Sequence, residues 1–203
     1  MICRGPTSIV INMTSELYTI GYASFSMDDF IHTLRKYEIT ALGDIRSAPY
    51  SKFRPEFKKN HLQNALTANG ISYVFLGNLL GARGEDSACY TDGKLNYALL
   101  KVSKNFRTGI TRVLNAIKDE RVTLMCAEKD PINCHRTFLV CRILRSFPVT
   151  MNHILADGSC EEHAMTERRL LQLYTDCDQT DIFRSERDLI EEAYDRQCAD
   201  ISL

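Results

Sequence analysis

The feature that most constrains the fold is an alternation of short apolar runs and amphipathic stretches between residues 17 and 155. Short apolar runs bounded by glycine and polar residues favour buried strands, and apolar spacings of three and four favour helices. Strands are predicted over residues 17–21, 39–45, 71–76, 122–125 and 149–155, and helices over residues 26–37, 55–69, 95–118 and 134–146. Strands joined by helices predict a mainly parallel sheet covered on both faces. We therefore expect an α/β fold, a three-layer sandwich with a sheet of about five strands.

The length of 203 residues suits one well-packed α/β domain. We divide the chain into an N-terminal extension (residues 1–15), a single α/β domain (16–177) and a C-terminal helical tail (178–203). Residues 77–93 are rich in glycine and are predicted to form a long loop, a feature that is often functional. From about residue 160 onward the chain is predicted to be helical.

Composition restricts the partners and the location. The net charge of −1 produces no global field for a polyanion, so any nucleic-acid surface has to be local. No stretch approaches the roughly 20 apolar residues of a membrane helix, and the first fifteen residues lack the pattern of a secretory signal. The eight cysteines are scattered, unlike those of a small disulfide-rich domain. We expect reduced thiols, a cytoplasmic location and no membrane partner.

The densest concentration of chemically active side chains lies between residues 121 and 136. A predicted strand is followed by a short turn at Pro131 and by the start of a predicted helix. The side chains of interest along this segment are Cys126, Glu128, Cys134, His135 and Arg136. In an open parallel sheet, ligands bind at the carboxyl ends of the strands. The segment therefore predicts an active site at that edge.

Polar residues follow other predicted strands at the same edge. Tyr22 comes after the first strand, and Asp44 and Arg46 close the second. We predict that the catalytic residues are Cys126, Glu128, Cys134 and His135, and that the substrate-binding residues are Tyr22, Asp44, Arg46, Arg54 and Arg136. Structural roles stay open for some of them, because Asp44 and Arg46 can form an ion pair and Arg136 can pair with a nearby acid.

The sequence does not decide which thiol is the nucleophile. Cys134 begins a predicted helix close to Arg136, and both features favour a thiolate. Cys126 lies at the carboxyl end of a predicted strand, which is where ligands bind in an open parallel sheet. A cysteine there can also serve as a small buried apolar residue. Both thiols therefore remain candidates.

Basic and aromatic side chains are interleaved in residues 46–61. The basic residues are Arg46, Lys52, Arg54, Lys58 and Lys59, the one acid is Glu56, and the aromatic residues are Tyr50, Phe53 and Phe57. Basic groups neutralise phosphates and aromatic rings stack on unpaired bases, so the segment suits single-stranded or flipped nucleic acid. The alternative is that Phe57 belongs to the core and the lysines form the solvated face of a helix.

Several known site classes do not fit the spacing. Cys126, Cys134, His135 and His153 lack the close cysteine pair of structural zinc sites. A zinc deaminase needs a second Pro-Cys-x-x-Cys element, which is missing. No thioredoxin pair, phosphate-binding loop or dinucleotide fingerprint is present. We therefore predict no metal and no cofactor.

A series of different short motifs is spread along residues 17–155. They are Tyr18-Thr-Ile-Gly-Tyr22, Asp44-Ile-Arg46 followed by Pro49 and Ser51, Gly70-Ile-Ser-Tyr73, Leu76-Gly77 with Leu80-Gly81, Cys126-Ala-Glu128, Cys134-His-Arg136 and His153-Ile154. In this order they resemble the domain of unknown function 488 family. The resemblance implies an α/β domain whose motifs cluster, and it supplies no established reaction. Members often carry histidine where this chain has Tyr22, so no proton-transfer role is carried over to that position.

These observations favour a cysteine-dependent enzyme that acts on a phosphate-bearing ligand, a nucleotide or a nucleic acid. In this hypothesis the three arginines of the predicted site bind anionic oxygens. One of the two thiols is the nucleophile, and Glu128 or His135 is the acid–base group. Asp44 would orient Arg46 or a substrate hydroxyl. The alternative hypothesis is a non-catalytic module that binds nucleic acid or a metal at the same edge.

Overall fold

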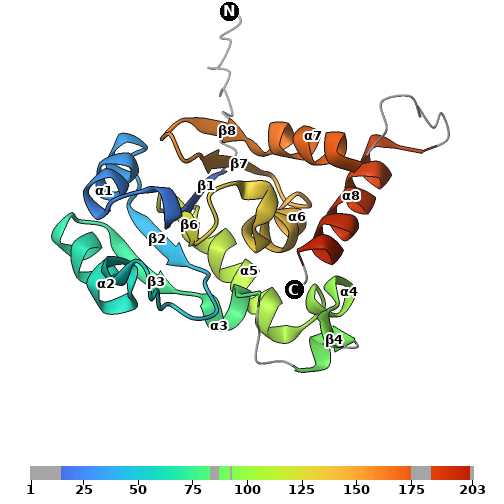
Figure 1. Ribbon diagram of the computed structural model, residues 1–203, viewed down its shortest axis with the longest axis horizontal. Coiled ribbons are helices and arrows are strands. Elements are labelled where there is room, and N and C mark those ends of the chain that lie inside the picture. Colours follow the sequence, from blue (N-terminus) through green and yellow to red (C-terminus); the bar gives the residue numbers. More distant parts are fainter. Residues whose placement is uncertain (1–14, 83–86, 92, 175–183, 202–203) are drawn as a thin grey trace, which may run out of the picture.

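A six-stranded sheet forms the centre of the computed structural model, which describes residues 15–82, 87–91, 93–174 and 184–201 (Figure 1). The strands are β1 (Ser15–Gly21), β2 (Ala41–Asp44), β3 (Ser72–Phe75), β6 (Val122–Cys126), β7 (Val149–Ile154) and β8 (Cys160–Glu162), in the order β3-β2-β6-β1-β7-β8. The first five pair in parallel, and β8 pairs antiparallel with β7. The expected α/β sandwich with a mainly parallel sheet is confirmed. The extra strand β8 corrects the prediction that the chain is wholly helical from residue 160.

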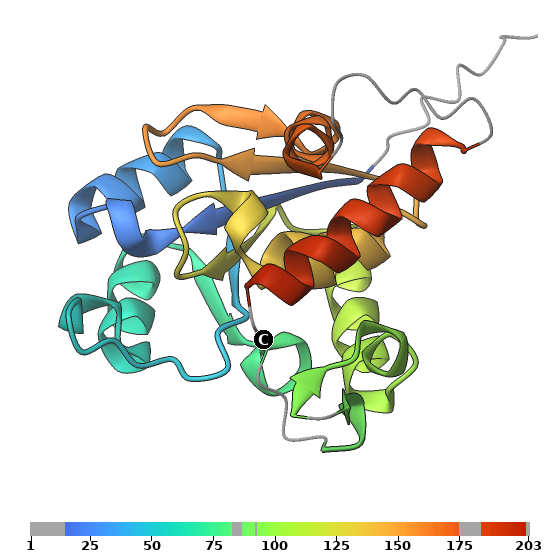
Figure 2. The same cartoon turned by 45° about the vertical axis from the view of Figure 1, so that its right-hand side comes forward.

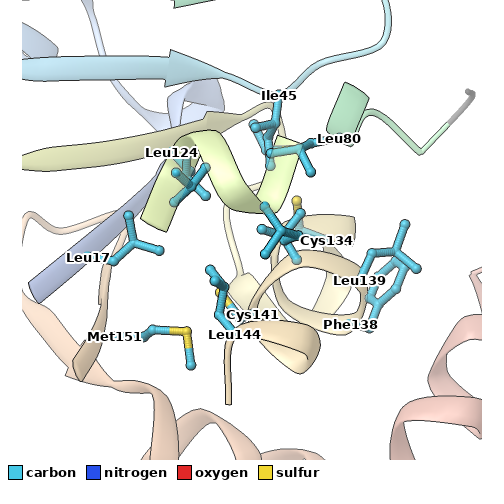
Figure 3. Packing of buried hydrophobic residues seen from close by; sticks show 14 of the residues in the cluster. Leu17, Ile45, Leu80, Leu124, Cys134, Phe138, Leu139, Cys141, Leu144 and Met151 are labelled. Carbon is cyan, nitrogen blue, oxygen red and sulfur yellow. The ribbon is translucent and has the colours of Figure 1, made fainter. Parts of the chain in front are cut away.

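Helices cover both faces of the sheet. The longer ones are α1 (Met27–Lys36), α2 (Lys59–Ala68), α5 (Lys104–Ala116), α7 (His163–Tyr174) and α8 (Glu186–Asp200). The shorter elements are η1 (Tyr22–Ser24), η2 (Pro55–Phe57), α3 (Gly77–Leu80), η3 (Ser87–Cys89), α4 (Tyr97–Leu100), η4 (Pro131–Asn133), the π-helical turn η5 (Arg136–Cys141), α6 (Arg142–Leu144) and the two-stranded pair β4 (Tyr90–Thr91) and β5 (Lys94–Leu95). The apolar residues of α1 and α2 form one core with one face of the sheet, and those of α5 to α8 form a second core with the other. Figure 3 shows Cys134 and Cys141 among the leucines of this second core.

Capping residues explain where several helices begin. Ser26 caps α1 by accepting a hydrogen bond from the Asp29 N–H at 3.1 Å. Ser103 caps α5 by accepting from the Phe106 N–H at 3.3 Å. Because a helix starts anew at this serine, the single helix predicted over residues 95–118 is divided into α4 and α5.

The glycine-rich segment 77–93 is more ordered than the predicted loop. It contains α3, η3 and β4 among its described residues. A Cβ atom at Gly77 would lie 1.9 Å from the Arg46 carbonyl oxygen, so only glycine lets α3 approach the end of β2 so closely. The glycine is therefore explained by backbone contact.

The C-terminal helix α8 lies against the second core. Ile190 is 7% exposed and Tyr194 is fully buried. The Gln197 amide also donates a hydrogen bond to the Ile132 carbonyl at 2.8 Å. Figure 2 shows α8 crossing in front of α6 on this face. The helix predicted within residues 178–203 is thus part of the packed structure, while residues 1–14 and 175–183 lie outside the described residues.

Strand register brings the predicted site residues toward one edge. Gly21 at the end of β1 pairs with Cys126 at the end of β6, and Asp44 at the end of β2 pairs with Met125. The carboxyl ends of three neighbouring strands therefore meet, as expected for a ligand-binding edge. Within the described ranges, no helix is long and apolar enough to cross a membrane.

Candidate functional site

Two thiols and an imidazole meet where β6 ends. The Cys126 sulfur lies 3.4 Å from Nδ1 of His135, and the Cys134 sulfur lies 3.9 Å from the same nitrogen. All three ligand atoms lie within 4.8 Å of one another. Cys126 is 4% exposed, Cys134 1% and His135 9%. We call Cys126, Cys134 and His135 the strand-end group.

A backbone carbonyl fixes the orientation of the His135 ring. Its Nε2 lies 3.1 Å from the carbonyl oxygen of Ile45, directly after β2. A carbonyl only accepts hydrogen bonds, so Nε2 carries a proton and Nδ1 is the nitrogen left facing the sulfurs. In the neutral ring, Nδ1 can therefore accept the proton of the Cys126 thiol.

The two thiols differ in acidity because one donates to the other. A hydrogen bond from Cys134 holds the pKa of Cys126 well below its usual value; the charges of His135 and Arg136 add to this effect and outweigh burial. Burial and the neighbouring Cys126 raise the pKa of Cys134 well above its usual value. Burial by itself would lower the pKa of His135, but the adjacent Cys126 raises it. This arrangement favours a Cys126 thiolate beside a His135 imidazolium.

Arg136 is directed at the backbone of the loop between β6 and η4. It is fully buried, and its guanidinium donates to the carbonyl oxygens of Glu128 at 3.0 Å and Lys129 at 3.1 Å. A Cβ atom at Gly21 would lie 1.7 Å from the Glu128 oxygen, so the loop lies directly on the end of β1. These contacts give Arg136 a structural role in holding the loop.

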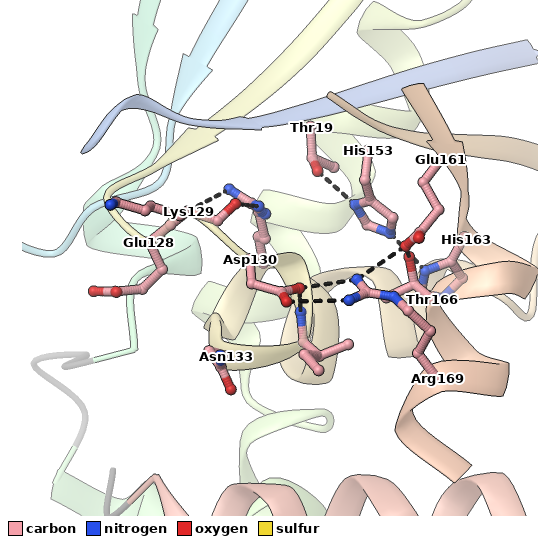
Figure 4. A network of polar contacts seen from close by, with 12 residues as sticks. Thr19, Glu128, Lys129, Asp130, Asn133, His153, Glu161, His163, Thr166 and Arg169 are labelled. Atoms are coloured by element: carbon pink, nitrogen blue, oxygen red, sulfur yellow. Dashed lines mark hydrogen bonds and ion pairs between the residues drawn. The ribbon is translucent and has the colours of Figure 1, made fainter. Parts of the chain in front are cut away.

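The Glu128 carboxylate is not among the potential ligand atoms that lie within 4.8 Å of one another in the strand-end group. The residue is exposed, and Figure 4 shows its carboxylate pointing away from the polar network around Asp130. Among the described residues, the carboxylate takes part in no hydrogen bond or ion pair, whereas the Glu128 carbonyl binds Arg136. Of the four predicted catalytic residues, the structure brings three together.

Asp44 and Arg46 form a buried ion pair. The Arg46 guanidinium donates to both Asp44 oxygens, at 2.9 and 2.6 Å, and to the Phe57 carbonyl at 2.9 Å. The Tyr73 hydroxyl donates to Asp44 at 2.9 Å. The Tyr22 ring stacks on Phe57 with centroids 4.5 Å apart and lies 5.0 Å from the guanidinium carbon. Asp44, Arg46 and Tyr22 therefore lie together at the predicted edge, with the charges of the ion pair turned toward protein groups.

Arg54 binds the turn that follows β1. Its guanidinium donates to Glu56 at 2.7 Å and to the carbonyl oxygens of Ala23, at 3.0 Å, and Phe25. The Ala23 N–H in turn donates to the Ala127 carbonyl, directly after Cys126. The basic segment is thus joined through Arg54 to the end of β6.

Sequence reasoning missed the contributions of Ile45 and Tyr73. The first acts through a backbone carbonyl, which no side-chain pattern reveals. The second belongs to the motif Gly70-Ile-Ser-Tyr73, but nothing in that motif indicated that its hydroxyl donates to Asp44.

Among the residues that the structure describes, two sets of side chains have a composition that can hold a metal ion. One is the strand-end group, with two sulfurs and one nitrogen. The other consists of Cys141, His153 and His163, whose ligand atoms also lie within 4.8 Å of one another; we call it the interlayer group. His153, considered above with the first set, is thus placed with the second.

The fold and site define an α/β protein with a buried cysteine–histidine group at the carboxyl ends of parallel strands. The family described as Domain of unknown function DUF488 matches residues 26–143, more than half of the chain. The chain belongs to this family, which confirms the resemblance seen in its motifs. No curated protein matches the chain, and no solved structure does either.

Proposed function

We propose that this protein is a cytoplasmic cysteine-dependent enzyme whose nucleophile is Cys126. The observation that carries the proposal is the 3.4 Å contact between the Cys126 sulfur and Nδ1 of His135, whose other nitrogen is held by Ile45. A nucleophile beside a base that is oriented by a third group is the arrangement used in covalent catalysis. A reducing compartment would keep Cys126 and Cys134 as the free thiols that this chemistry needs.

Each side chain of the strand-end group has a defined part in the proposed reaction. His135 takes the thiol proton, and the Cys126 thiolate attacks an electrophilic atom of the substrate. The bond to the leaving group breaks, and the leaving group departs with the proton held by His135. Water, deprotonated by His135, then cleaves the bond to sulfur, and the proton is shared again between Cys126 and His135. The Cys134 thiol stabilises the thiolate by hydrogen bonding.

The proposed ligand is a phosphate-bearing molecule, a nucleotide or single-stranded nucleic acid. Support comes from the surface of the basic segment, where Phe53 is 88% exposed and Tyr50 is 63% exposed. Lys52 is also exposed, and the Lys58 ammonium lies 4.8 Å from the Tyr50 ring centroid. Exposed rings next to ammonium groups suit base stacking combined with phosphate contacts. Arg54 connects this surface to the end of β6.

The test of the nucleophile is the ultraviolet absorbance of thiolate at neutral pH. Wild type is compared with Cys126→Ser and with Cys160→Ser, a control at an exposed cysteine. We expect the thiolate signal to vanish in Cys126→Ser and to persist in Cys160→Ser. An unchanged signal in Cys126→Ser would contradict the proposal, and this readout does not require a reagent to reach the buried sulfur.

The test of the ligand is binding of a labelled single-stranded oligonucleotide, measured by fluorescence anisotropy over a range of salt concentrations. We expect Phe53→Ala and Lys58→Ala each to weaken binding, and Lys58→Ala to reduce its salt dependence. Phe147→Ala is the matched control, because this exposed phenylalanine precedes β7 and therefore lies near the amino ends of the strands, away from the proposed site at their carboxyl ends. Equal binding by all four proteins would remove nucleic acid as the ligand.

A second candidate function is metal binding by the strand-end group. Three potential ligand atoms lie within 4.8 Å of one another. In addition, Nε2 of His135 donates its proton to the Ile45 carbonyl, and metal-bound histidines commonly donate their other N–H to such a carbonyl. Metal analysis of purified wild type and Cys134→Ser separates the two functions. Metal present in wild type and lost in Cys134→Ser would favour this candidate over the free thiolate.

A further inference from the structure

The interlayer group lies inside the second core, away from the proposed chemistry. Its members come from three elements, with Cys141 at the end of η5, His153 on β7 and His163 at the start of α7. Cys141 and His153 are fully buried, and His163 is 5% exposed. Burying two imidazoles and a thiol together is costly unless their polar atoms have partners.

Both outer ring nitrogens of the histidines face oxygen atoms. Nδ1 of His153 lies 2.6 Å from the Thr19 hydroxyl. Nε2 of His163 lies 3.3 Å from a Glu167 carboxylate oxygen and 3.2 Å from the Tyr194 hydroxyl. Figure 4 shows His153 between Thr19 and His163, in a chain that crosses from β1 to α7. The rings are therefore fixed with their inner nitrogens toward each other.

The inner nitrogens and the sulfur form a cluster of potential ligands. Nε2 of His153 and Nδ1 of His163 are 2.9 Å apart, and the Cys141 sulfur lies within 4.8 Å of the ligand atoms of both rings. Within the part of the chain that the structure describes, the Cys141 thiol has no hydrogen-bond partner. Three potential ligand atoms thus converge on one small volume.

We propose that the interlayer group binds one Zn²⁺ ion through the Cys141 sulfur, Nε2 of His153 and Nδ1 of His163. Zn²⁺ takes cysteine and histidine ligands, and metal-bound histidines usually donate their other N–H to a carboxylate or another oxygen. Here those oxygens are already in place on Glu167 and Thr19. With Zn–N distances of about 2.0–2.1 Å, the two inner nitrogens need to separate to only about 3.3 Å.

The protons balance in a simple way. Without metal, His153 donates from Nε2 to His163 and accepts from Thr19. On binding, the His153 proton moves to Nδ1, where it is donated to the Thr19 oxygen, and the Cys141 proton is released. The thiolate and the Glu167 carboxylate, which lies 3.3 Å from Nε2 of His163, compensate the charge of the ion.

Glu167, which contacts His163, also lines a groove on the surface. The groove has a volume of about 680 Å³ and is lined in part by Arg145, Ala164, Glu167 and Ile190. Three protein ligands leave a fourth position for a water molecule. A bound ion would cross-link η5, β7 and α7.

The first test is X-ray absorption spectroscopy on wild-type protein expressed in zinc-supplemented medium. We expect one sulfur and two nitrogens around the metal. Two sulfurs and one nitrogen would instead identify the strand-end group, and a protein without zinc after loading would equally overturn the proposal. This measurement needs no substitution, so it does not depend on whether a variant folds.

The second test is the zinc content of matched variants. Cys141→Ser and His163→Gln should each hold one equivalent less than wild type and lose the thiolate-to-metal charge-transfer band after Co²⁺ substitution. Cys134→Ser is the control and should keep both the equivalent and the band. A Cys141→Ser protein with the zinc content of wild type would overturn the proposal, whatever the outcome for the Cys126 nucleophile.

Discussion

The strand-end group and the interlayer group are built from the same residue types on the same face of the sheet, yet they differ in charge. In the first, hydrogen bonding from Cys134 lowers the pKa of Cys126, and Cys126 raises the pKa of His135. In the second, burial raises the pKa of Cys141 to about 12 and lowers that of His153 well below its usual value.

The hydrogen-bond donors that surround each sulfur decide whether it is a thiol or a thiolate. Both sulfurs are almost fully buried, so burial alone would keep both protonated. Cys126 has a thiol and an imidazole within reach, whereas the rings near Cys141 bond to each other. The strand-end group is therefore prepared for nucleophilic chemistry, whereas the Cys141 thiol of the interlayer group keeps its proton until a cation replaces it.

The largest expected effect follows from Arg136, whose charge acts on both groups. Arg136→Met leaves two carbonyl oxygens without their donor and should lower the free energy of unfolding by about 3 kcal/mol. Urea unfolding measures the change. Arg168→Met, at an exposed arginine on α7, should stay within about 0.5 kcal/mol of wild type. Equal stability of the two variants would contradict the structural role of Arg136 in holding the loop between β6 and η4.

The next effect concerns the reactivity of Cys126 and separates the role of His135 from that of His163. His135→Asn removes the imidazole beside Cys126, so the pKa of this thiol should rise and its alkylation by iodoacetamide at neutral pH should slow about tenfold or more. Peptide mass spectrometry follows Cys126 separately from the other thiols. His163→Asn is the control and should leave the rate unchanged. A similar loss in both variants would show that the two groups are not independent.

A pH experiment tests the opposite signs of the two cysteines in metal-free protein. The pKa of Cys141 is raised to about 12 in the folded state, so its contribution to stability is complete below the ordinary value near 9 and is lost as pH rises toward 12. Between about pH 8 and about pH 10 this loss is about 1 kcal/mol. For Cys126, whose folded pKa is lowered, the contribution instead grows as pH rises toward 9.

Urea unfolding at these pH values, with reductant and chelator present, measures both contributions. Relative to wild type, Cys141→Ala should flatten the loss of stability at high pH, and Cys126→Ala should remove the gain below pH 9. The same pH dependence in both variants would mean that the two thiols have the same ionisation state, and the comparison would fail.

The position of the strand-end group could be predicted from the sequence better than the hydrogen-bond partners of the nearby arginines. Periodicity placed Cys126 at the end of a strand, and parallel pairing brought it beside Gly21 without any knowledge of side chains. Arg46 does form the ion pair with Asp44 that its spacing allowed, but its remaining donor and the donors of Arg136 end on backbone carbonyls of other segments. No pattern of residue types encodes such carbonyl contacts. The predicted role of both arginines in binding a phosphate stays a prediction.

The interlayer group was harder to see for a related reason. His163 follows β8, a three-residue strand within the stretch predicted to be helical from about residue 160 onward. Only the antiparallel turn from β7 to β8 returns the chain so that His163 faces His153 ten residues earlier. Short edge strands depend on tertiary pairing more than on local propensity, which is why the contact could not be read from spacing.

The smallest effect concerns Thr19, which touches the interlayer group only through His153. Thr19→Val removes the 2.6 Å hydrogen bond and should cost about 1 kcal/mol in unfolding free energy without metal. It should also weaken zinc binding by about 10-fold or more, because the oxygen that orients His153 is lost.

Thr166→Val is the matched variant, since Thr166 is equally buried and its hydroxyl donates to Glu161 rather than to a histidine. It should show a similar change in urea unfolding and no change in a competitive zinc titration. Equal zinc affinity in the two threonine variants would reduce the Thr19 contact to packing, and it would leave His153 without the oriented proton that a metal ligand at Nε2 requires.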